Sequence, residues 1–450
     1  MEITDTIIHS ITSATDFICG YPLFVLLIGG GIILFAYSRA IPIRCLGQAI
    51  KSLRQKENGE GQISSFQALM TTISSTVGMG NIAGVAIAIA IGGPGTIFWM
   101  WISALVGMST KFFEGTLAIL YKGKDNLGET QGGPMYIMTE GLGRRWKPLA
   151  VCFSCFALVG CLCTMQANQL TESIITVFTT PAGIPDSFTL KLFIGLCIGS
   201  IVAIVVIGGI QRISIIASKV APVMVTLYFI LVMTVIILNI HRLPDVFIRI
   251  FSEAFNLQAG WGALAGVAIT GARRAMYVNE AGVGTASLMH GASKNNCPAK
   301  EGLIAMLGPA IDSGFVCTLT AIPILMADNY HIAGEGVKGL TIALNAYNQL
   351  LPGFGQYILM VIVAIFAFST MFSYSYYGTK CFGYLFGMQN ARHYNYFYLF
   401  MLILACIISL DTAISIMDLA FALMAFCTMF TIFRLAPKVK LEMKKSHLLK

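Results

Sequence analysis

A cluster of small and polar residues interrupts a long apolar run, and its residue types suit it to ion and substrate binding. The run extends over residues 67–107, and the segment Val77–Asn81 (VGMGN) follows Ser74 near the middle of its first helix-length part. Glycine weakens a helix, and serine and asparagine side chains compete for its backbone hydrogen bonds. Within lipid, freed backbone groups are tolerated only where they are buried in protein or line a cavity. The segment is therefore a candidate ligand site.

The two kinds of freed backbone group favour ligands of opposite charge. Unwound carbonyl groups from Ser74 to Val77 suit Na⁺ or an ammonium group, because hard cations prefer oxygen ligands. A half-helix that begins after Gly80 directs its N-terminal N–H groups toward the break, and these suit a carboxylate. A zwitterion that enters together with a cation satisfies both demands.

The composition indicates a polytopic membrane protein. The 450 residues are 56% hydrophobic and 11% charged, with a mean hydropathy of +0.77, whereas an average soluble domain has about 25% charged residues. The net charge of +8 arises from Lys and Arg in alternate loops, which is typical of membrane topology and gives no indication of nucleic-acid binding. The 12 Cys are scattered in apolar runs and predict neither a disulfide framework nor a metal site.

Apolar runs of about 17–25 residues predict eleven transmembrane spans. They cover residues 21–38, 64–91, 95–120, 149–178, 190–208, 213–239, 260–286, 302–325, 353–377, 394–410 and 412–433. The less apolar segment 337–351 precedes Pro352 and predicts a short surface or re-entrant helix.

The distribution of basic residues predicts the orientation. Residues 1–20 contain no Lys or Arg and so lack the basic flank of a signal peptide. Basic residues follow the first span at once, and only Lys191, Arg242, Arg249 and Lys338 fall in segments that this order places outside. Basic loops remain in the cytoplasm. We therefore expect a multi-pass protein of the plasma membrane, the bacterial inner membrane, with its N-terminus outside and its basic tail, residues 434–450, in the cytoplasm.

The seventh predicted span repeats the unusual composition of the second. Gly266, Thr270 and Gly271 lie near the centre of residues 260–287, and the span runs in the opposite direction. Two interrupted spans of opposite direction, five spans apart, are typical of inverted-repeat transporters. Residues 64–239 and 260–433 would form the two halves of one transport domain covering residues 1–450, with span 21–38 added. The alternative is that the glycines only allow close helix packing.

Six segments, in this order, resemble motifs of the alanine or glycine:cation symporter family. They are GNIAGVA (80–86), GGPGTIFWMWISALVG (92–107), GGPMYI (132–137), QAN (166–168), NEAGVG (279–284) and FSTMFSYSYYG (368–378). The resemblance implies an all-α leucine-transporter-type fold, a 5+5 inverted repeat with one extra N-terminal helix. It also implies sodium-coupled symport of a small neutral amino acid, alanine or glycine, with serine or D-alanine as further candidates.

The resemblance also implies site residues. Na⁺ would be held by backbone carbonyls near Ser74 and Val77 and by the hydroxyls of Ser369 and Thr370. The residues expected at the substrate are Val77, Gly78, Gly80 and Asn81 at the first break, Gln166 on the fourth span, Thr270, Gly271 and Asn279 on the seventh, and Tyr374 on the ninth. Met79, Ile87 and Tyr374 depart from the family pattern, which often has Thr or Ser, Thr, and Trp at these positions.

Several polar residues inside the spans need partners. Gln166 and Asn168 are two residues apart and point to different faces of a helix, so we expect Gln166 alone to reach substrate. Arg273 and Glu280 share one helical face and predict an internal ion pair or a cytoplasmic gate. Lys111 and Glu114, at i and i+3, predict a structural pair.

Three other functions are weighed against sodium symport. Asp312 in the eighth span has no evident partner, so proton-coupled transport through Asp312 or Glu280 is an alternative. The six His are dispersed over loops and ends, and no nucleophile–base arrangement points to an enzyme. Paired interrupted spans argue against a channel. Apart from the co-transported ion, the amino acid and the lipid bilayer, no cofactor, nucleic acid or obligatory protein partner is expected.

Overall fold

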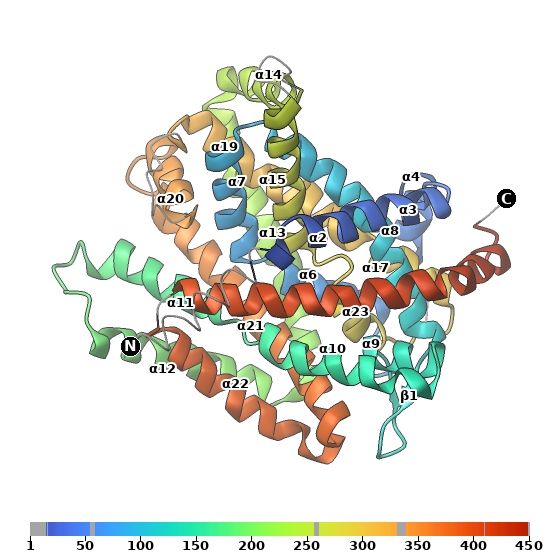
Figure 1. Cartoon of the computed structure of the whole chain (residues 1–450). Helices are drawn as coiled ribbons and strands as arrows, with labels where there is room; N and C mark the ends of the chain where they lie inside the picture. Colours follow the sequence, from blue (N-terminus) through green and yellow to red (C-terminus); the bar gives the residue numbers. More distant parts are fainter. Residues whose placement is uncertain are drawn as a thin grey trace.

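The structure, a computed structural model, consists almost entirely of helices. It describes residues 15, 17–54, 59–255, 261–330, 339–408 and 410–448, except for the side chains of residues 261–265 and 410–416. Within this part of the chain the only strands are β1 (Gly123–Lys124) and β2 (Thr130–Gln131), which form a short antiparallel hairpin. Figure 1 shows the helices packed around a central group that includes α6, α8, α13 and α21.

The helices of the first half of the chain begin with a segment before the first broken span. They are α2 (Tyr21–Phe24), η1 (Val25–Gly29), α3 (Gly30–Tyr37), α4 (Ile41–Arg44), α5 (Leu46–Ser52), α6 (Ser65–Thr76), η2 (Gly80–Gly84), α7 (Val85–Gly92), α8 (Thr96–Leu120), α9 (Pro134–Tyr136), η3 (Ile137–Gly141), η4 (Arg144–Trp146), α10 (Lys147–Gly160), α11 (Thr164–Ile174), η5 (Ile175–Thr179), α12 (Phe188–Val206), α13 (Gly209–Leu238), η6 (Ile240–Arg242) and α14 (Leu243–Ala254).

The helices of the second half follow the same plan of long rods with short connecting turns. They are α15 (Trp261–Asn279), α16 (Thr285–His290), α17 (Pro298–Ala305), α18 (Leu307–Pro309), η8 (Ala310–Val316), α19 (Cys317–Ala327), α20 (Gly339–Leu350), α21 (Gly355–Phe386), η10 (Met388–Asn390), α22 (Ala391–Ala405) and α23 (Leu410–Lys445). The helix α20 confirms the short helix predicted over 337–351, whose first two residues lie outside the described part of the chain.

Among the described residues, eight helices are long and apolar enough to cross a membrane, and a ninth span consists of two helices that bend by 55° at a break. They fit a multi-pass membrane protein. Helices also occupy the seventh and tenth predicted spans, but α15 carries two arginines and α22 has only 15 residues, and neither meets the same requirement of length and apolarity. The count of eleven spans and the inverted repeat therefore remain predictions.

The bend of 55° lies at the predicted interruption of the second span. Ser64 and Gln67 form a capping box that fixes the start of α6. The helix ends at Val77, whose φ of −75° and ψ of 95° are extended, and η2 begins at Gly80. The sequence prediction of a break within Val77–Asn81 is thus confirmed.

The interruption of the seventh span is not where the sequence suggested. Helix α15 continues without a break through Gly271 to Asn279, and the chain then turns at Glu280, which has a φ of 51°, before α16 begins at Thr285. Gly271 serves helix packing instead, because a Cβ there would lie 2.3 Å from the Thr96 carbonyl oxygen of α8.

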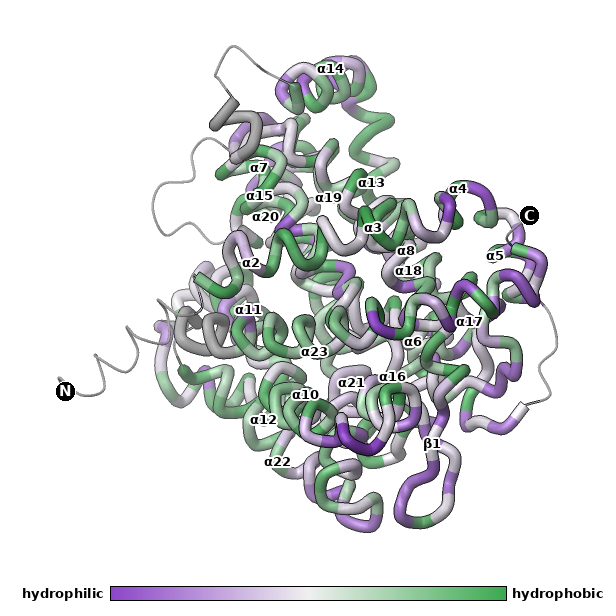
Figure 2. The backbone as a smooth tube through the Cα atoms, turned by 45° about the vertical axis from the view of Figure 1, so that its right-hand side comes forward, coloured by the Kyte–Doolittle hydropathy of each residue, from purple (hydrophilic) through white to green (hydrophobic). Residues whose placement is uncertain are grey.

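The two interrupted spans are held by different long helices. Helix α6 packs against α13 and α21, whereas α15 and α17 pack against α8. The long helix α23 crosses the front of the molecule and packs along α10 (Figure 1). Hydrophilic residues gather around α4, α5, β1 and the C-terminal end, whereas the tubes of the long helices are mostly hydrophobic (Figure 2). The segments that precede α6 and follow α8 therefore share one polar side.

Candidate functional site between the two interrupted spans

Asn81 stabilises the first break from within. Its Oδ1 accepts a hydrogen bond from the Gly78 N–H at 2.9 Å, and its Nδ2 donates to the Asp312 carbonyl in η8 at 3.4 Å. The side chain is fully buried. Both ends of the amide are thus used to satisfy backbone groups, so Asn81 fixes the shape of the break and joins it to the eighth span.

The carbonyl oxygen of Ser74 is the centre of a cluster of oxygens between α6 and α21. It accepts the hydroxyl of Ser369 at 3.2 Å and that of Thr370 at 3.4 Å, while the Ser74 hydroxyl donates to the Ser369 carbonyl at 3.1 Å. Each of the two α21 hydroxyls also lies within hydrogen-bond distance of the Phe366 carbonyl, at 2.9 and 3.1 Å. All three polar side chains are about 1% exposed.

This geometry suits a cation of the size of Na⁺. Oxygens bind Ca²⁺, an ion of similar radius, at about 2.3–2.6 Å, so ligands at right angles lie about 3.3–3.7 Å apart. The Ser74 carbonyl and the hydroxyls of Ser369 and Thr370 lie at or near such separations, 3.2 and 3.4 Å. A hydroxyl that donates to the Phe366 carbonyl keeps its lone pairs for a cation. The C-terminal end of α6 adds the negative end of a helix dipole.

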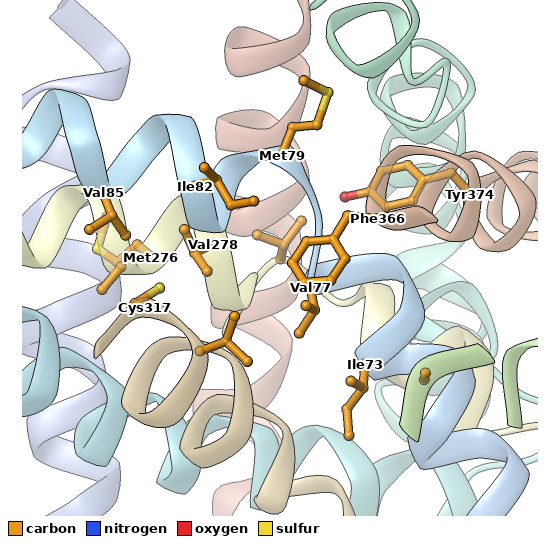
Figure 3. Packing of buried hydrophobic residues seen from close by; sticks show 14 of the residues in the cluster. Ile73, Val77, Met79, Ile82, Val85, Met276, Val278, Cys317, Phe366 and Tyr374 are labelled. Carbon is orange, nitrogen blue, oxygen red and sulfur yellow. The ribbon is translucent and has the colours of Figure 1, made fainter. Parts of the chain in front are cut away.

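Val77 and Gly78 complete the wall of this cluster. Val77 is fully buried at the connection between the two half-helices, with the ring of Phe366 beside it (Figure 3). A Cβ on Gly78 would lie 2.6 Å from the Thr370 hydroxyl oxygen, so only glycine allows this close approach. Gly80 faces α15, since a Cβ there would meet Val278 at 3.9 Å. The first break therefore lies directly between α21 and the end of α15.

The second break is held by two carboxylates. Glu280 accepts hydrogen bonds from the Tyr374 hydroxyl and, at 2.5 Å, from that of Thr285. Glu114 of α8 accepts the Gly282 N–H at 2.5 Å. Figure 3 shows the Tyr374 hydroxyl directed from α21 toward the region of the break. A backbone that leaves the helix within a span needs such partners, and these carboxylates supply them.

The predicted pair of Arg273 and Glu280 is not formed. The cation whose charge acts on Glu280 is Lys111, and Arg273 acts together with Arg274 on Asp418 of α23. Lys111 acts on Glu114 and Asp312 as well. Its ammonium group is buried without a hydrogen-bond partner, and no ion pair with Glu114 is formed among the described residues. One buried lysine thus lies close enough to act on three carboxylates, although the described part of the chain contains no ion pair between it and any of them.

Four other expected site residues lie in different places. Thr270 and Gly271 pack where α15 crosses Gly92 and Thr96, about 15 Å along the helix from the second break at 1.5 Å per residue. Asn279 caps that break, because its Oδ1 accepts the Ala281 N–H at 3.0 Å. The Oε1 of Gln166, on α11, is buried without a hydrogen-bond partner. Gln166 therefore remains available to a ligand.

Asn168 has a structural role, although its Oδ1, like the Gln166 Oε1, is buried without a hydrogen-bond partner. Its Nδ2 donates to the carbonyls of Ala405 and Ile408, at 2.9 and 2.8 Å, where α22 ends. The Asn168 amide thus has backbone partners on α22, and the expected contact of Gln166 with substrate remains a prediction.

A buried polar cluster lies where α6 begins and α16 ends. Sequence reasoning did not predict it. The Glu301 carboxylate binds His290 Nδ1 at 2.6 Å, and accepts the Ser65 hydroxyl at 2.5 Å and the Asn295 Nδ2 at 3.0 Å. It joins α6, α16 and α17. The available signals were an acidic residue inside an apolar run, Glu114, and another, Glu301, directly before the predicted span 302–325.

The chain before α6 is also paired with the chain after α16. Gly59 and Gln62 donate backbone N–H groups to the carbonyls of Lys294 and Ala292, at 2.8 Å each, and Lys294 donates to Ile63 at 2.8 Å. We call these segments, 59–63 and 292–294, together with the cluster around Glu301, the inner latch. It fastens the start of α6 to the segment that follows α16 on one side of the molecule.

The chain was compared with known proteins. The model of the sodium:alanine symporter family matches residues 3–447. The sodium/alanine symporter AgcS of Methanococcus maripaludis is 37% identical over 394 residues, 85% of each chain. The probable sodium/glutamine symporter GlnT of Bacillus subtilis is 32% identical and covers 97% of this chain and 90% of its own. The putative sodium/proton-dependent alanine carrier protein YrbD of Bacillus subtilis is 36% identical over 79% of this chain and 74% of its own. The chain belongs to the sodium:alanine symporter family.

Proposed function

We propose that this protein is a sodium-coupled symporter of a small neutral amino acid, alanine or glycine. The observation that supports this most directly is the convergence of two α21 hydroxyls on the Ser74 carbonyl at the end of a broken helix. The name of the relative AgcS, a sodium/alanine symporter, agrees with it. In this proposal Na⁺ binds to the carbonyls of Ser74 and Val77 and to the hydroxyls of Ser369 and Thr370.

The cation would order the site for the amino acid. Bound Na⁺ replaces the hydrogen bonds between α6 and α21 and fixes the break, so the N–H groups after Gly78 are directed to the substrate carboxylate. Gly80 and Gln166 are the further candidates for substrate contact. Figure 3 shows the rings of Phe366 and Tyr374 next to each other beside the connection that holds Val77, and such bulky neighbours favour a substrate with a small side chain.

The overall design follows from the same proposal. Residues 64–239 and 260–433 would form two inverted repeats, with span 21–38 added, the N-terminus outside and the basic tail 434–450 in the cytoplasm. One Na⁺ driven by about 100 mV supplies about 2.3 kcal/mol, and a tenfold gradient adds about 1.4 kcal/mol. Together they sustain an accumulation of roughly a few hundredfold.

Uptake by proteoliposomes tests the proposal. Labelled alanine should accumulate when Na⁺ is higher outside, and an inside-negative potential should increase the rate. The double variant Ser369→Ala with Thr370→Ala should lose this accumulation, while Ser154→Ala, which removes a buried hydroxyl that binds its own helix at 2.8 Å, should keep it. Equal uptake by the wild type with and without the Na⁺ gradient would refute the coupling.

Proton coupling is the second candidate. Asp312 is 1% exposed and lies in the π-helical segment η8 beside Asn81, and the relative YrbD is named sodium/proton-dependent. An imposed pH gradient in Na⁺-free buffer distinguishes the two. Accumulation under that gradient that is lost in Asp312→Asn would favour protons.

A further inference from the structure

Lys380 is a buried lysine that the proposed transport site does not use. It lies on α21, ten residues beyond Thr370 and so about 15 Å farther along the helix. Its side chain is 2% exposed, and its ammonium group donates to the Tyr376 hydroxyl at 3.0 Å. Among the described residues no carboxylate lies within ion-pair distance of it.

The carboxylate whose charge acts on Lys380 from a distance, Asp125, already accepts hydrogen bonds from other groups. Asp125 accepts hydrogen bonds from the backbone N–H groups of Leu127 and Glu129, at 2.8 and 3.0 Å, and from Gln131 Nε2 at 2.9 Å. A second cation, Lys122, acts on Lys380 as well. A buried charge is costly unless it is paired, and a lysine has three donors of which one is used here.

Lys380 lines a cavity. It has a volume of about 150 Å³, and its polar lining includes Lys380, Thr379, Gln62, Gln131 and Asn395. A single water needs only about 10–15 Å³ of such space, so the cavity can hold a larger group. The side-chain amides of Gln62 and Asn395 can donate hydrogen bonds, whereas the Thr379 hydroxyl donates to Ser375 or Asn395 and Gln131 Nε2 donates to Asp125. The wall around Ile210 is apolar.

We propose that this cavity is a second binding site, which holds one small monovalent anionic group against Lys380. The group is either a free halide or the carboxylate of the departing amino acid; the second source rests on the proposed transport function. Gln62 belongs to the inner latch, and Tyr377, one turn before Lys380, binds the Ser75 hydroxyl of α6 at 2.7 Å. Because Gln62 lines the cavity just before α6 begins, the site adjoins the latch, while the Tyr377 contact joins the same stretch of α21 to the end of α6.

Thermal unfolding of the purified protein tests the site with chloride as the probe. At constant Na⁺, replacement of gluconate by chloride should raise the unfolding temperature in a saturable way. Lys380→Met should need an about tenfold or greater chloride concentration, whereas Lys380→Arg, which keeps the charge, and Lys191→Met, which removes an external lysine, should respond as the wild type does.

A second arm identifies the source of the anion. In buffer without Na⁺ or halide, alanine should protect the wild type but not Lys380→Met, and alaninamide, which lacks the carboxylate, should protect neither. Protection by chloride alone assigns the site to a free halide, and protection by alanine assigns it to the departing carboxylate.

Two results would overturn the site. One is the absence of protection by both ligands in the wild type, and the other is equal protection in the wild type and Lys380→Met. If Lys380→Met does not fold, bromide-soaked crystals of the wild type replace it, and the absence of an anomalous peak beside Nζ would overturn the halide. Na⁺-driven uptake by the wild type is measured separately. If the wild type shows no such uptake but chloride still protects it, the transport proposal is refuted and the anion site is not.

Discussion

Ser74 and Ser369 exchange hydrogen bonds: each hydroxyl donates to the carbonyl of the other residue, at 3.1 and 3.2 Å. The pair fastens the last turn of α6 to the middle of α21. Because the same oxygens would bind a cation, Na⁺ must compete with these two hydrogen bonds. Cation binding and the contact between α6 and α21 are therefore linked. The relationship leads to the first prediction.

Ser369→Ala should weaken Na⁺ binding while the protein stays folded. It removes one proposed ligand and one hydrogen bond, so we expect the Na⁺ concentration for half-maximal uptake to rise about tenfold, equivalent to about 1.4 kcal/mol. Uptake of labelled alanine over a series of Na⁺ concentrations measures it. Ser154→Ala is the control, and an unchanged Na⁺ dependence in Ser369→Ala would remove this residue from the cation site.

Gly78→Ala should disturb the same site by steric means. Its Cβ would lie 2.6 Å from the Thr370 hydroxyl oxygen, well inside van der Waals contact, so the hydroxyl must move or the break must shift, at a cost of about 1–3 kcal/mol. Thermal unfolding and Na⁺-dependent uptake should both be impaired. The double variant with Thr370→Ala should recover stability but not Na⁺ dependence.

Gly84→Ala is the matched control for Gly78→Ala, because nothing lies within 4 Å of a Cβ at that position of the same span. Its stability should equal that of the wild type or exceed it, since alanine favours helix. Equal effects of the two substitutions would show that the close approach of Gly78 to Thr370 has no special role.

The first break could be predicted from the sequence and the second could not be placed. At residues 77–81 glycines coincide with polar residues in an apolar run, and a helix break is the simplest explanation of this composition. In the seventh span Gly271 serves a helix crossing at Thr96, which sequence periodicity does not reveal. The actual turn begins at Glu280, in a left-handed conformation uncommon for a non-glycine residue. The contacts of Lys111, Glu114 and Glu301 could not be predicted from the sequence, because their partners come from distant segments of the chain.

Tyr374→Phe should destabilise the second break. Glu280 would keep Thr285 as its one hydroxyl donor and lose the other, and a hydrogen bond to a charged group contributes about 1.5–3 kcal/mol. We expect a lower unfolding temperature and slower uptake. Tyr357→Phe, which changes a 41% exposed tyrosine on the same helix, is the control. An effect no larger than that of the control would mean that the Tyr374 hydroxyl does not support Glu280.

Glu301→Gln should loosen the inner latch and thereby make the paired backbone segments more dynamic. The carboxylate binds His290, Ser65 and Asn295, and an amide cannot accept from all three. Amide hydrogen exchange should therefore quicken, by about tenfold or more for a loss of about 1.5 kcal/mol, in residues 59–63 and 292–294. Helix α14, which packs against α8, α15 and α19 away from the latch, should exchange as before.

The same measurement links the latch to the cation site. If Na⁺ bridges α6 and α21, it should slow exchange in residues 59–63 of the wild type, because α6 continues from them through its capping box to Ser74. Ser369→Ala should abolish this Na⁺ effect without quickening exchange in Na⁺-free buffer as Glu301→Gln does. Glu442→Gln, at a carboxylate that is 12% exposed and binds Lys445 at 2.6 Å, controls for the loss of a charge. If neither Na⁺ nor Glu301→Gln changes the exchange rate of residues 59–63, the inner latch is not coupled to the ion site.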